Sequence, residues 1–303
     1  MKLRYGLLAL AFLLLTSFPA QATKVNKADL EATHILMGKV ESVESFYGVN
    51  ERGDQIILSH VKVKALKWIK GDHSSAVDFL VEGGSVGDMA LKVSDIPEFE
   101  KGQRLRLLLK KENGEFKYED SEIEETTRFK PAKAAAGCCK TYAAWPQLPV
   151  NYLVNTANAD CPPLPDLDAA ATAWNRTVDV LHDAGSTGKA VAAYDGENVI
   201  FFNKTSSGGA IAVTYLWYNK RARVMLEFDM YFFESAWQFY SLTRGDDCLD
   251  GFYYKTIATH ELGHAVGIDH NRCVDSIMYP YASYCGINGL TPADKACLTA
   301  LYQ

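Results

Sequence analysis

Apolar and polar residues alternate in short runs through the first third of the chain. The runs are rich in β-branched residues and lie at 33–45, 55–69, 77–84, 104–110 and 115–118. Such alternation is typical of strands with one buried face, and turn residues separate the runs, among them Asn113-Gly114 between the last two. We therefore predict a small all-β domain, a five-stranded barrel or sandwich, over residues 23–118.

The pattern changes after residue 118. Residues 119–125 are acidic and residues 130–137 are small and basic, so we predict that residues 119–137 form an exposed linker, which a protease could cut. Beyond the linker, runs typical of strands alternate with runs typical of helices. We expect strands at 148–154, 191–193, 198–202, 210–217 and 224–232, and helices at 166–181, 255–266 and 292–302, the last capped by Thr291. Residues 138–303 thus form a second domain that combines strands and helices.

The N-terminus has the pattern of a secretory signal peptide. Lys2 and Arg4 precede an apolar run at 7–15, and Ala20-Gln21-Ala22 is a small-x-small cleavage sequence. Nine apolar residues fall short of the roughly 20 that span a bilayer. We predict cleavage after Ala22, a secreted or periplasmic protein, and no membrane association afterwards.

Charge and cysteine content narrow the classes of function. The net charge is −6 and the isoelectric point is near 5.7, which gives no basic surface for nucleic acid. Export brings the cysteines into an oxidising compartment, where disulfides form. There are seven, an odd number, at 138, 139, 161, 248, 273, 285 and 297. The pattern leaves their connectivity open.

The segment HELGHAVGIDH at 260–270 carries the candidate chemistry. His260 and His264 are four residues apart, so on a helix they share one face and can bind one metal ion. Glu261 can reach a water on that metal, and Gly267 lets the chain turn so that His270 becomes a third ligand. Three histidines leave the fourth position of a tetrahedral zinc open, as in catalytic sites.

Eight residues after His270, the segment SIMYPY contains Met278. Zinc peptidases with this histidine signature carry a methionine turn beneath the metal. HELGHAVGIDH followed by SIMYP resembles the metzincin zinc peptidases and, within them, the matrixins. VMLEFDMYF, with Glu227 and Asp229, is similar to a matrixin strand, and LTPADKACLTALY resembles the closing helix of the family. The resemblance covers about residues 138–303.

The resemblance implies an α+β fold of the metzincin type, a twisted mixed sheet with an active-site helix. It implies a secreted zinc endopeptidase acting on proteins or peptides, with one catalytic zinc and Glu261 as general base. It places the substrate along an edge strand within Gly209–Trp217 and the wall of the following pocket at Pro280–Tyr284. No segment matches the histidine-rich loop that holds a second, structural zinc in vertebrate matrixins, and the sequence does not support calcium.

Three alternatives remain open at this stage. The zinc domain could be the scaffold of a binding or adhesion protein, although such a scaffold has no use for Glu261. The N-terminal β-domain could regulate the peptidase as an inhibitor or chaperone. A thiolate of Cys138 or Cys139 could occupy the open zinc position and keep the enzyme latent, although a disulfide is the more usual state of such cysteines in an oxidising compartment.

Overall fold

The computed structural model describes residues 32–71, 73–123, 138–159, 163–203 and 210–303. The predicted signal peptide at 1–22, residues 124–137 of the predicted linker, and Cys161 lie outside these ranges. Within them, no helix combines the length and apolar character needed to cross a membrane.

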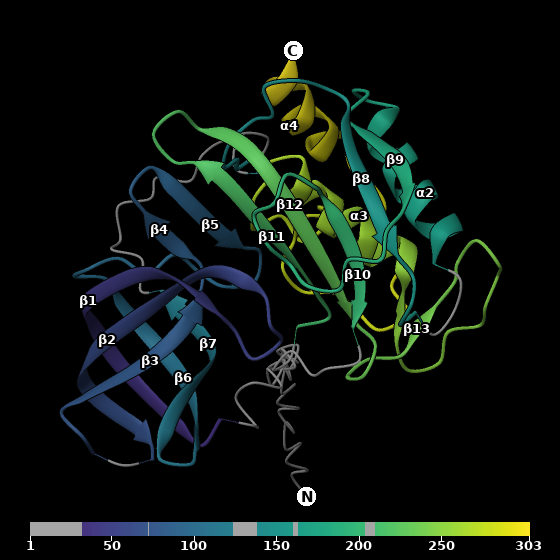
Figure 1. Cartoon of the computed structure of the whole chain (residues 1–303). Coiled ribbons are helices and arrows are strands. Elements are labelled where there is room, and N and C mark those ends of the chain that lie inside the picture. Colours follow the sequence, from purple (N-terminus) through teal and green to yellow (C-terminus); the bar gives the residue numbers. More distant parts are fainter. Residues whose placement is uncertain (1–31, 72, 124–137, 160–162, 204–209) are drawn as a thin grey trace, which may run out of the picture.

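Five strands form a closed barrel near the N-terminus (Figure 1). They follow the order β1-β2-β3-β7-β6, with bounds β1 His34–Val49, β2 Gln55–Lys70, β3 Ala76–Glu82, β6 Arg104–Glu112 and β7 Glu115–Ile123. Alternate residues such as Val61, Val63, Leu105 and Leu107 fill its interior. The Asn113-Gly114 turn joins β6 and β7 as predicted, with both residues at positive φ.

Two segments differ from the predicted division of the chain. Strand β7 continues to Ile123, so the acidic residues at the start of the predicted linker belong to a strand that pairs with β6. Strands β4 (Gly84–Val86) and β5 (Met89–Val93) leave the barrel and join the sheet of the C-terminal part. The residues between β3 and β6 thus connect the two parts of the molecule.

The C-terminal sheet has seven strands in the order β4-β5-β11-β12-β10-β8-β9. The strands not yet given are β8 Val150–Asn155, β9 Leu181–Ser186, β10 Val199–Asn203, β11 Ala212–Asn219 and β12 Val224–Phe233. β11 is antiparallel to both of its neighbours, whereas β12, β10, β8 and β9 run parallel. A short parallel pair, β13 (Phe239–Tyr240) and β14 (Phe252–Tyr253), precedes the central helix. This mixed sheet with segregated helices fits the α+β class.

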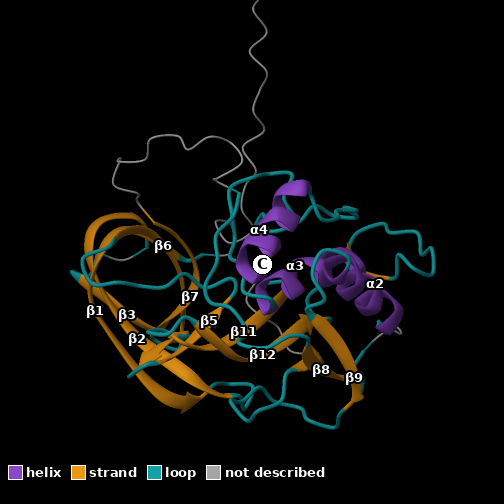
Figure 2. Cartoon of the chain, turned by 90° about the horizontal axis from the view of Figure 1, so that it is seen from above, coloured by secondary structure: helices purple, strands orange, loops and turns teal. Residues whose placement is uncertain are grey.

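Three helices lie on one side of this sheet (Figure 2). They are α2 (Leu164–Asn175), α3 (Tyr254–Ala265) and α4 (Pro292–Tyr302). The other face of the sheet packs against β2 of the barrel, where Ile56, Ile57 and Leu58 join one apolar cluster with residues of β11 and β12. The barrel and the sheet therefore share a core.

Helix α2 is shorter than the predicted helix at 166–181. The side chain of Asn175 accepts hydrogen bonds from the backbone N–H groups of Val180 and Leu181 at 3.1 and 3.0 Å and donates to the carbonyl of Leu181. These bonds turn the chain out of the helix, and Leu181 begins β9 instead. The predicted strand at 191–193 is also absent, and only Ala193 forms an isolated bridge, to Gln55.

Three disulfides lie within the described residues of the C-terminal part. They join Cys138 to Cys273, Cys139 to Cys297 and Cys248 to Cys285. Because Cys138 and Cys139 are both in disulfides, neither offers the thiolate on which the latency hypothesis depended.

Candidate metal centre

Helix α3 and the turn after it bring the three motif histidines together. His260 and His264 lie one turn apart on the same face of the helix. Gly267 follows with a φ of +93°, and a Cβ at this position would approach the carbonyl oxygen of Ala143 to 2.1 Å. Glycine is therefore required here, and its left-handed conformation returns the chain so that His270 faces the helix.

The three imidazoles converge through their Nε2 atoms. These atoms are 3.0 Å apart between His260 and His270, and 3.1 Å from His264 to each of the other two. Nδ1 of His260 lies 2.6 Å from the carbonyl of Ile277, and Nδ1 of His264 lies 2.8 Å from that of Ile268. Since a carbonyl only accepts, each Nδ1 carries the proton and each Nε2 presents a lone pair.

Such a donor set fits a metal ion. Converging lone pairs repel one another unless a cation lies between them, and the nitrogen ligands of a tetrahedral zinc are about 3.3 Å apart, given Zn–N bonds of about 2.0–2.1 Å. Burial lowers the pKa of His260 and, much further, those of His264 and His270. The imidazoles are therefore neutral at neutral pH, which is the state that binds metal.

The N-terminus of α4 supports this arrangement. Asp294 accepts hydrogen bonds from the backbone N–H groups of Ile277 and Thr291, at 3.2 and 2.8 Å, and one from the hydroxyl of Ser276. Thr291 caps the helix, as predicted. Because the carbonyl of Ile277 holds the ring of His260, Asp294 orients that ligand through one intermediate residue.

Met278 is fully buried and packs against α3. A Cβ on Gly263 would approach its sulfur to 2.3 Å, and would approach the ring of Trp174 to 2.9 Å. The indole N–H of Trp174 donates to the carbonyl of Thr259 at 2.9 Å. The methionine thus supports the helix turn that precedes His264.

Glu261 lies beside the histidines with its carboxylate engaged by two hydroxyl groups. The hydroxyl of Thr214 donates to its Oε2 at 2.6 Å, and that of Ser94 lies 3.4 Å from the same oxygen. Burial raises the pKa of Glu261 above its usual range, and a bound cation would oppose this shift. A carboxyl group with a raised pKa is suited to proton exchange near neutral pH.

Strand β11 passes beside this centre, but its edge is not free. β5 pairs with it antiparallel, from Tyr215 opposite Val93 to Asn219 opposite Met89. β11 is therefore not an edge strand over Tyr215–Trp217, contrary to the expectation, whereas the pairing with β5 does not include Ala212 and Val213. Unpaired strand edges readily accept another strand, and here a segment from before the predicted linker supplies one.

A wide cleft opens in front of the centre, between the barrel and the C-terminal part. His260, Glu261 and His270 line it, and so do Pro280, Tyr281 and Tyr284 of the predicted pocket wall. Asp95 lines the same cleft from the barrel side, with its Oδ1 3.8 Å from Nε2 of His270.

Glu227 and Asp229 of β12 lie away from the histidines and hold a loop. Glu227 accepts from the backbone N–H groups of Asp195 and Gly196, and Asp229 accepts from those of Ala193 and Val199. The two carboxylates thus hold the loop that leads into β10, through hydrogen bonds to the backbone of that loop.

Four residues at the site were not predicted from the sequence, namely Ser94, Asp95, Thr214 and Gly263. Asp95 and Ser94 lie far before the motif in a segment assigned to the β-domain, and Thr214 lies within a run read only as a strand. Gly263 was a detectable signal, because a glycine inside a helical pattern often marks close packing.

A comparison with known families agrees with this geometry. The family model described as matrixin, of peptidase family M10, matches residues 169–303. No curated protein matches the chain. Matrixins are zinc-dependent metallopeptidases, and His260, His264 and His270 are placed to hold a metal. The C-terminal part of the chain therefore contains a matrixin-like metzincin catalytic domain.

Proposed function

We propose that the mature chain is a secreted zinc endopeptidase in which His260, His264 and His270 hold the zinc and Glu261 is the general base. The observation that carries this proposal is the convergence of three Nε2 atoms at 3.0–3.1 Å beside a buried carboxylate. A closed structural zinc site would have a fourth protein ligand and no need of Glu261.

Each residue has a separate task. Zinc, when bound, supplies Lewis acidity that polarises a carbonyl oxygen and makes water more acidic. Glu261 takes a proton from the attacking water and returns it to the departing amine nitrogen. The hydroxyl of Thr214 fixes one carboxylate oxygen at 2.6 Å, so that Oε1 is the oxygen free for this exchange. Met278 supports the helix from below.

Export is part of the same proposal. The N-terminal 22 residues have the signal-peptide pattern, and three disulfides lie among the described residues of the C-terminal part. Such a disulfide set is typical of proteins that fold in an oxidising compartment.

The test compares the mature chain with Glu261→Gln, which keeps the size of the side chain and removes the base. Zinc per chain and cleavage of casein are measured before and after limited proteolysis within 124–137, with the exposed Glu41→Gln as the matched control. We expect one zinc in each protein and a loss of about 10²–10⁴-fold in kcat for Glu261→Gln alone. If every protein holds zinc and none cuts in either form, the domain is a zinc-stabilised binding module and the proposal is wrong.

A further inference from the structure

The third histidine of the centre is held differently from the other two. Nδ1 of His260 and Nδ1 of His264 each face a backbone carbonyl. Within the described residues, no carbonyl faces Nδ1 of His270 in this way. His270 also lies beyond the end of α3, after the turn at Gly267. Its direction toward the other two imidazoles therefore depends on the backbone that carries it.

Residues 138–142 run antiparallel beside this backbone. The N–H of Tyr142 donates to the carbonyl of Gly267 at 2.9 Å, and the N–H of Asp269 donates to the carbonyl of Lys140 at 2.7 Å. These two bonds span the turn that leads from the helix to His270. The 138–142 segment thus fixes the chain immediately before the third ligand.

The side chain of Asp269 connects this segment to the ligand itself. Its Oδ1 accepts from the backbone N–H of His270 at 2.8 Å and from the hydroxyl of Tyr142. Its Oδ2 pairs with the ammonium group of Lys140. Hydrogen bonds to an ionised carboxylate are stronger than those between neutral groups. The Tyr142 hydroxyl therefore restrains the carboxylate that binds the amide of His270.

The residue on the other side of the ligand, Asn271, is tied to the same segment. Its side-chain amide donates to the carbonyl of Cys138 at 3.0 Å and to the hydroxyl of Ser276 at 2.8 Å. Its backbone N–H donates to the carbonyl of Met278 at 3.0 Å. His270 thus lies between two side chains that both bond to the 138–142 segment.

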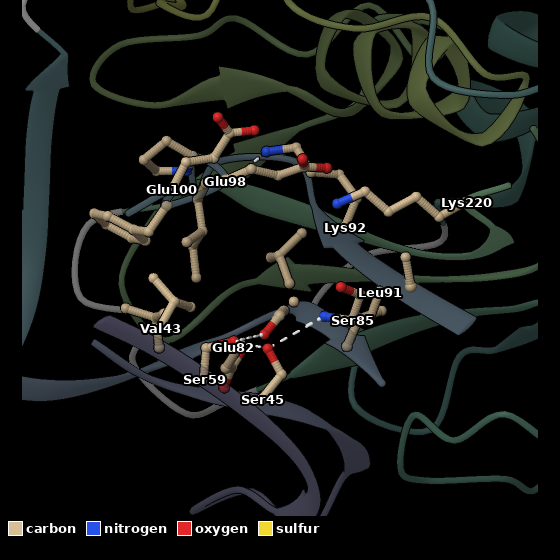
Figure 3. Close-up of a pocket in the computed structure, with 18 of the residues that line it drawn as sticks. Val43, Ser45, Ser59, Glu82, Ser85, Leu91, Lys92, Glu98, Glu100 and Lys220 are labelled. Carbon is tan, nitrogen blue, oxygen red and sulfur yellow. Dashed lines mark hydrogen bonds between the residues drawn. The ribbon is translucent and has the colours of Figure 1, made fainter. Parts of the chain in front are cut away.

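The ring of Tyr142 is itself held by packing. It lies against the core of the C-terminal part, with the ring centre of His264 6.3 Å from its own. The ammonium group of the buried Lys92 lies 6.0 Å from the ring centre, within the range of a cation–π attraction. Figure 3 shows Lys92 across a small cavity from Ser45 and Ser59 of the barrel. These contacts direct the Tyr142 hydroxyl toward Asp269.

We propose that Tyr142 is a positioning residue of the metal centre, whose hydroxyl fixes Asp269 and, through it, the backbone of His270. This inference rests on the proposed peptidase function, and it concerns a residue outside the HELGHAVGIDH segment. A tyrosine that served only to pack could be replaced by phenylalanine, because the ring and its contacts would remain. A positioning role requires the hydroxyl.

The first test measures how fast zinc passes from the full mature chain to a chelator. We compare the wild type with Tyr142→Phe and with Tyr302→Phe. The control also removes one partly buried hydroxyl, which donates to the carbonyl of Val266 at 2.9 Å and contacts neither neighbour of His270. We expect zinc transfer about tenfold faster in Tyr142→Phe, as when a group supporting a metal ligand is removed. Equal rates in all three proteins overturn the proposal.

The second test separates positioning from a general loss of stability. The visible absorption of Co²⁺ bound in place of zinc reports the geometry of its ligands. We expect this spectrum to change in Tyr142→Phe and to match the wild type in Tyr302→Phe. An unchanged spectrum in Tyr142→Phe means that its hydroxyl only stabilises the fold, and the proposal is wrong.

A pair of variants at Asp269 tests the intermediate step. Asp269→Asn keeps an oxygen that accepts from Tyr142 and His270, whereas Asp269→Ala removes it. We expect Asp269→Ala to release zinc at least as fast as Tyr142→Phe, and Asp269→Asn to release it more slowly than Asp269→Ala. Equal release from the two Asp269 variants would contradict a role for these hydrogen bonds.

Cleavage of casein by the same proteins distinguishes this inference from the proposed function. If Tyr142→Phe releases zinc faster and no protein cuts, the peptidase proposal fails while the positioning role stands. If the wild type cuts and Tyr142→Phe holds zinc equally well, the peptidase proposal stands and the positioning role is wrong.

Discussion

Replacing Gly263 by alanine would add one methyl group, which has two opposing effects on the stability of the protein. In an exposed helix, Gly→Ala would stabilise the fold by about 1 kcal/mol. Here the new Cβ would lie 2.3 Å from the sulfur of Met278 and 2.9 Å from the ring of Trp174, and overpacking costs about 1–3 kcal/mol. We expect Gly263→Ala to lower the free energy of unfolding by up to about 2 kcal/mol, as measured by urea denaturation.

Gly188→Ala is the matched control, because no atom lies within 4 Å of the Cβ that it would add. We expect its free energy of unfolding to stay within about 0.5 kcal/mol of the wild type. Equal stability of Gly263→Ala and the wild type would show that Met278 moves aside freely.

The residues that the sequence identified are those whose chemistry is local. His260, Glu261, His264 and His270 lie within eleven positions, so one helix and the turn at Gly267 place them together. Ser94 and Asp95 reach the centre only through tertiary pairing, with Ser94 lying 167 positions before Glu261. No periodicity in a single sequence records such a contact.

At the level of elements, boundaries were predictable where the capping signals were local. Helix α4 runs over Pro292–Tyr302 as predicted because Thr291 and Asp294 form a capping box. Helix α2 ends earlier than predicted because the side chain of Asn175 accepts hydrogen bonds from the backbone N–H groups of Val180 and Leu181. The pattern also could not show that β4 and β5 join the other sheet, since alternation indicates a strand and not its partner.

Strand β12 is expected to carry a pH-dependent contribution to stability. Burial raises the pKa of Glu227 to about 7, above its unfolded value of about 4.3. The contribution is therefore fully present below about pH 4 and is lost as the pH rises through about 7. We expect the melting temperature of Glu227→Gln, relative to the wild type, to be higher at pH 8 than at pH 5.

The control for this prediction is Glu197→Gln, on the same loop but exposed to solvent. Its difference from the wild type should not change with pH in this range. A constant difference for Glu227→Gln as well would mean that the hydrogen bonds from Asp195 and Gly196 keep Glu227 ionised throughout.

At the scale of the whole molecule, the Cys138–Cys273 disulfide closes a loop of chain around the metal domain, with a sequence separation of 135. We expect its removal in the double Cys→Ala variant to cost about 2–5 kcal/mol of stability in urea. Cys273 follows His270 by three residues, so the disulfide restrains the segment that carries this histidine. We therefore expect the double variant also to lose zinc to a chelator faster than the wild type.

The Cys248–Cys285 pair offers a comparison, with a separation of only 37. Chain entropy predicts that its removal costs about 1 kcal/mol less, and we expect no faster release of zinc. Equal release from both double variants would show that the first disulfide has no specific effect on His270.

The barrel is joined to the metal domain without any disulfide, because all seven cysteines lie at or after residue 138. A cut within 124–137 would therefore divide the chain into two polypeptides with only noncovalent contacts between them. Before the cut, the barrel and the metal domain belong to one chain, so their effective concentration for each other is fixed. Afterwards their association would follow mass action, so dilution would favour the separated polypeptides and crowding would favour the paired ones.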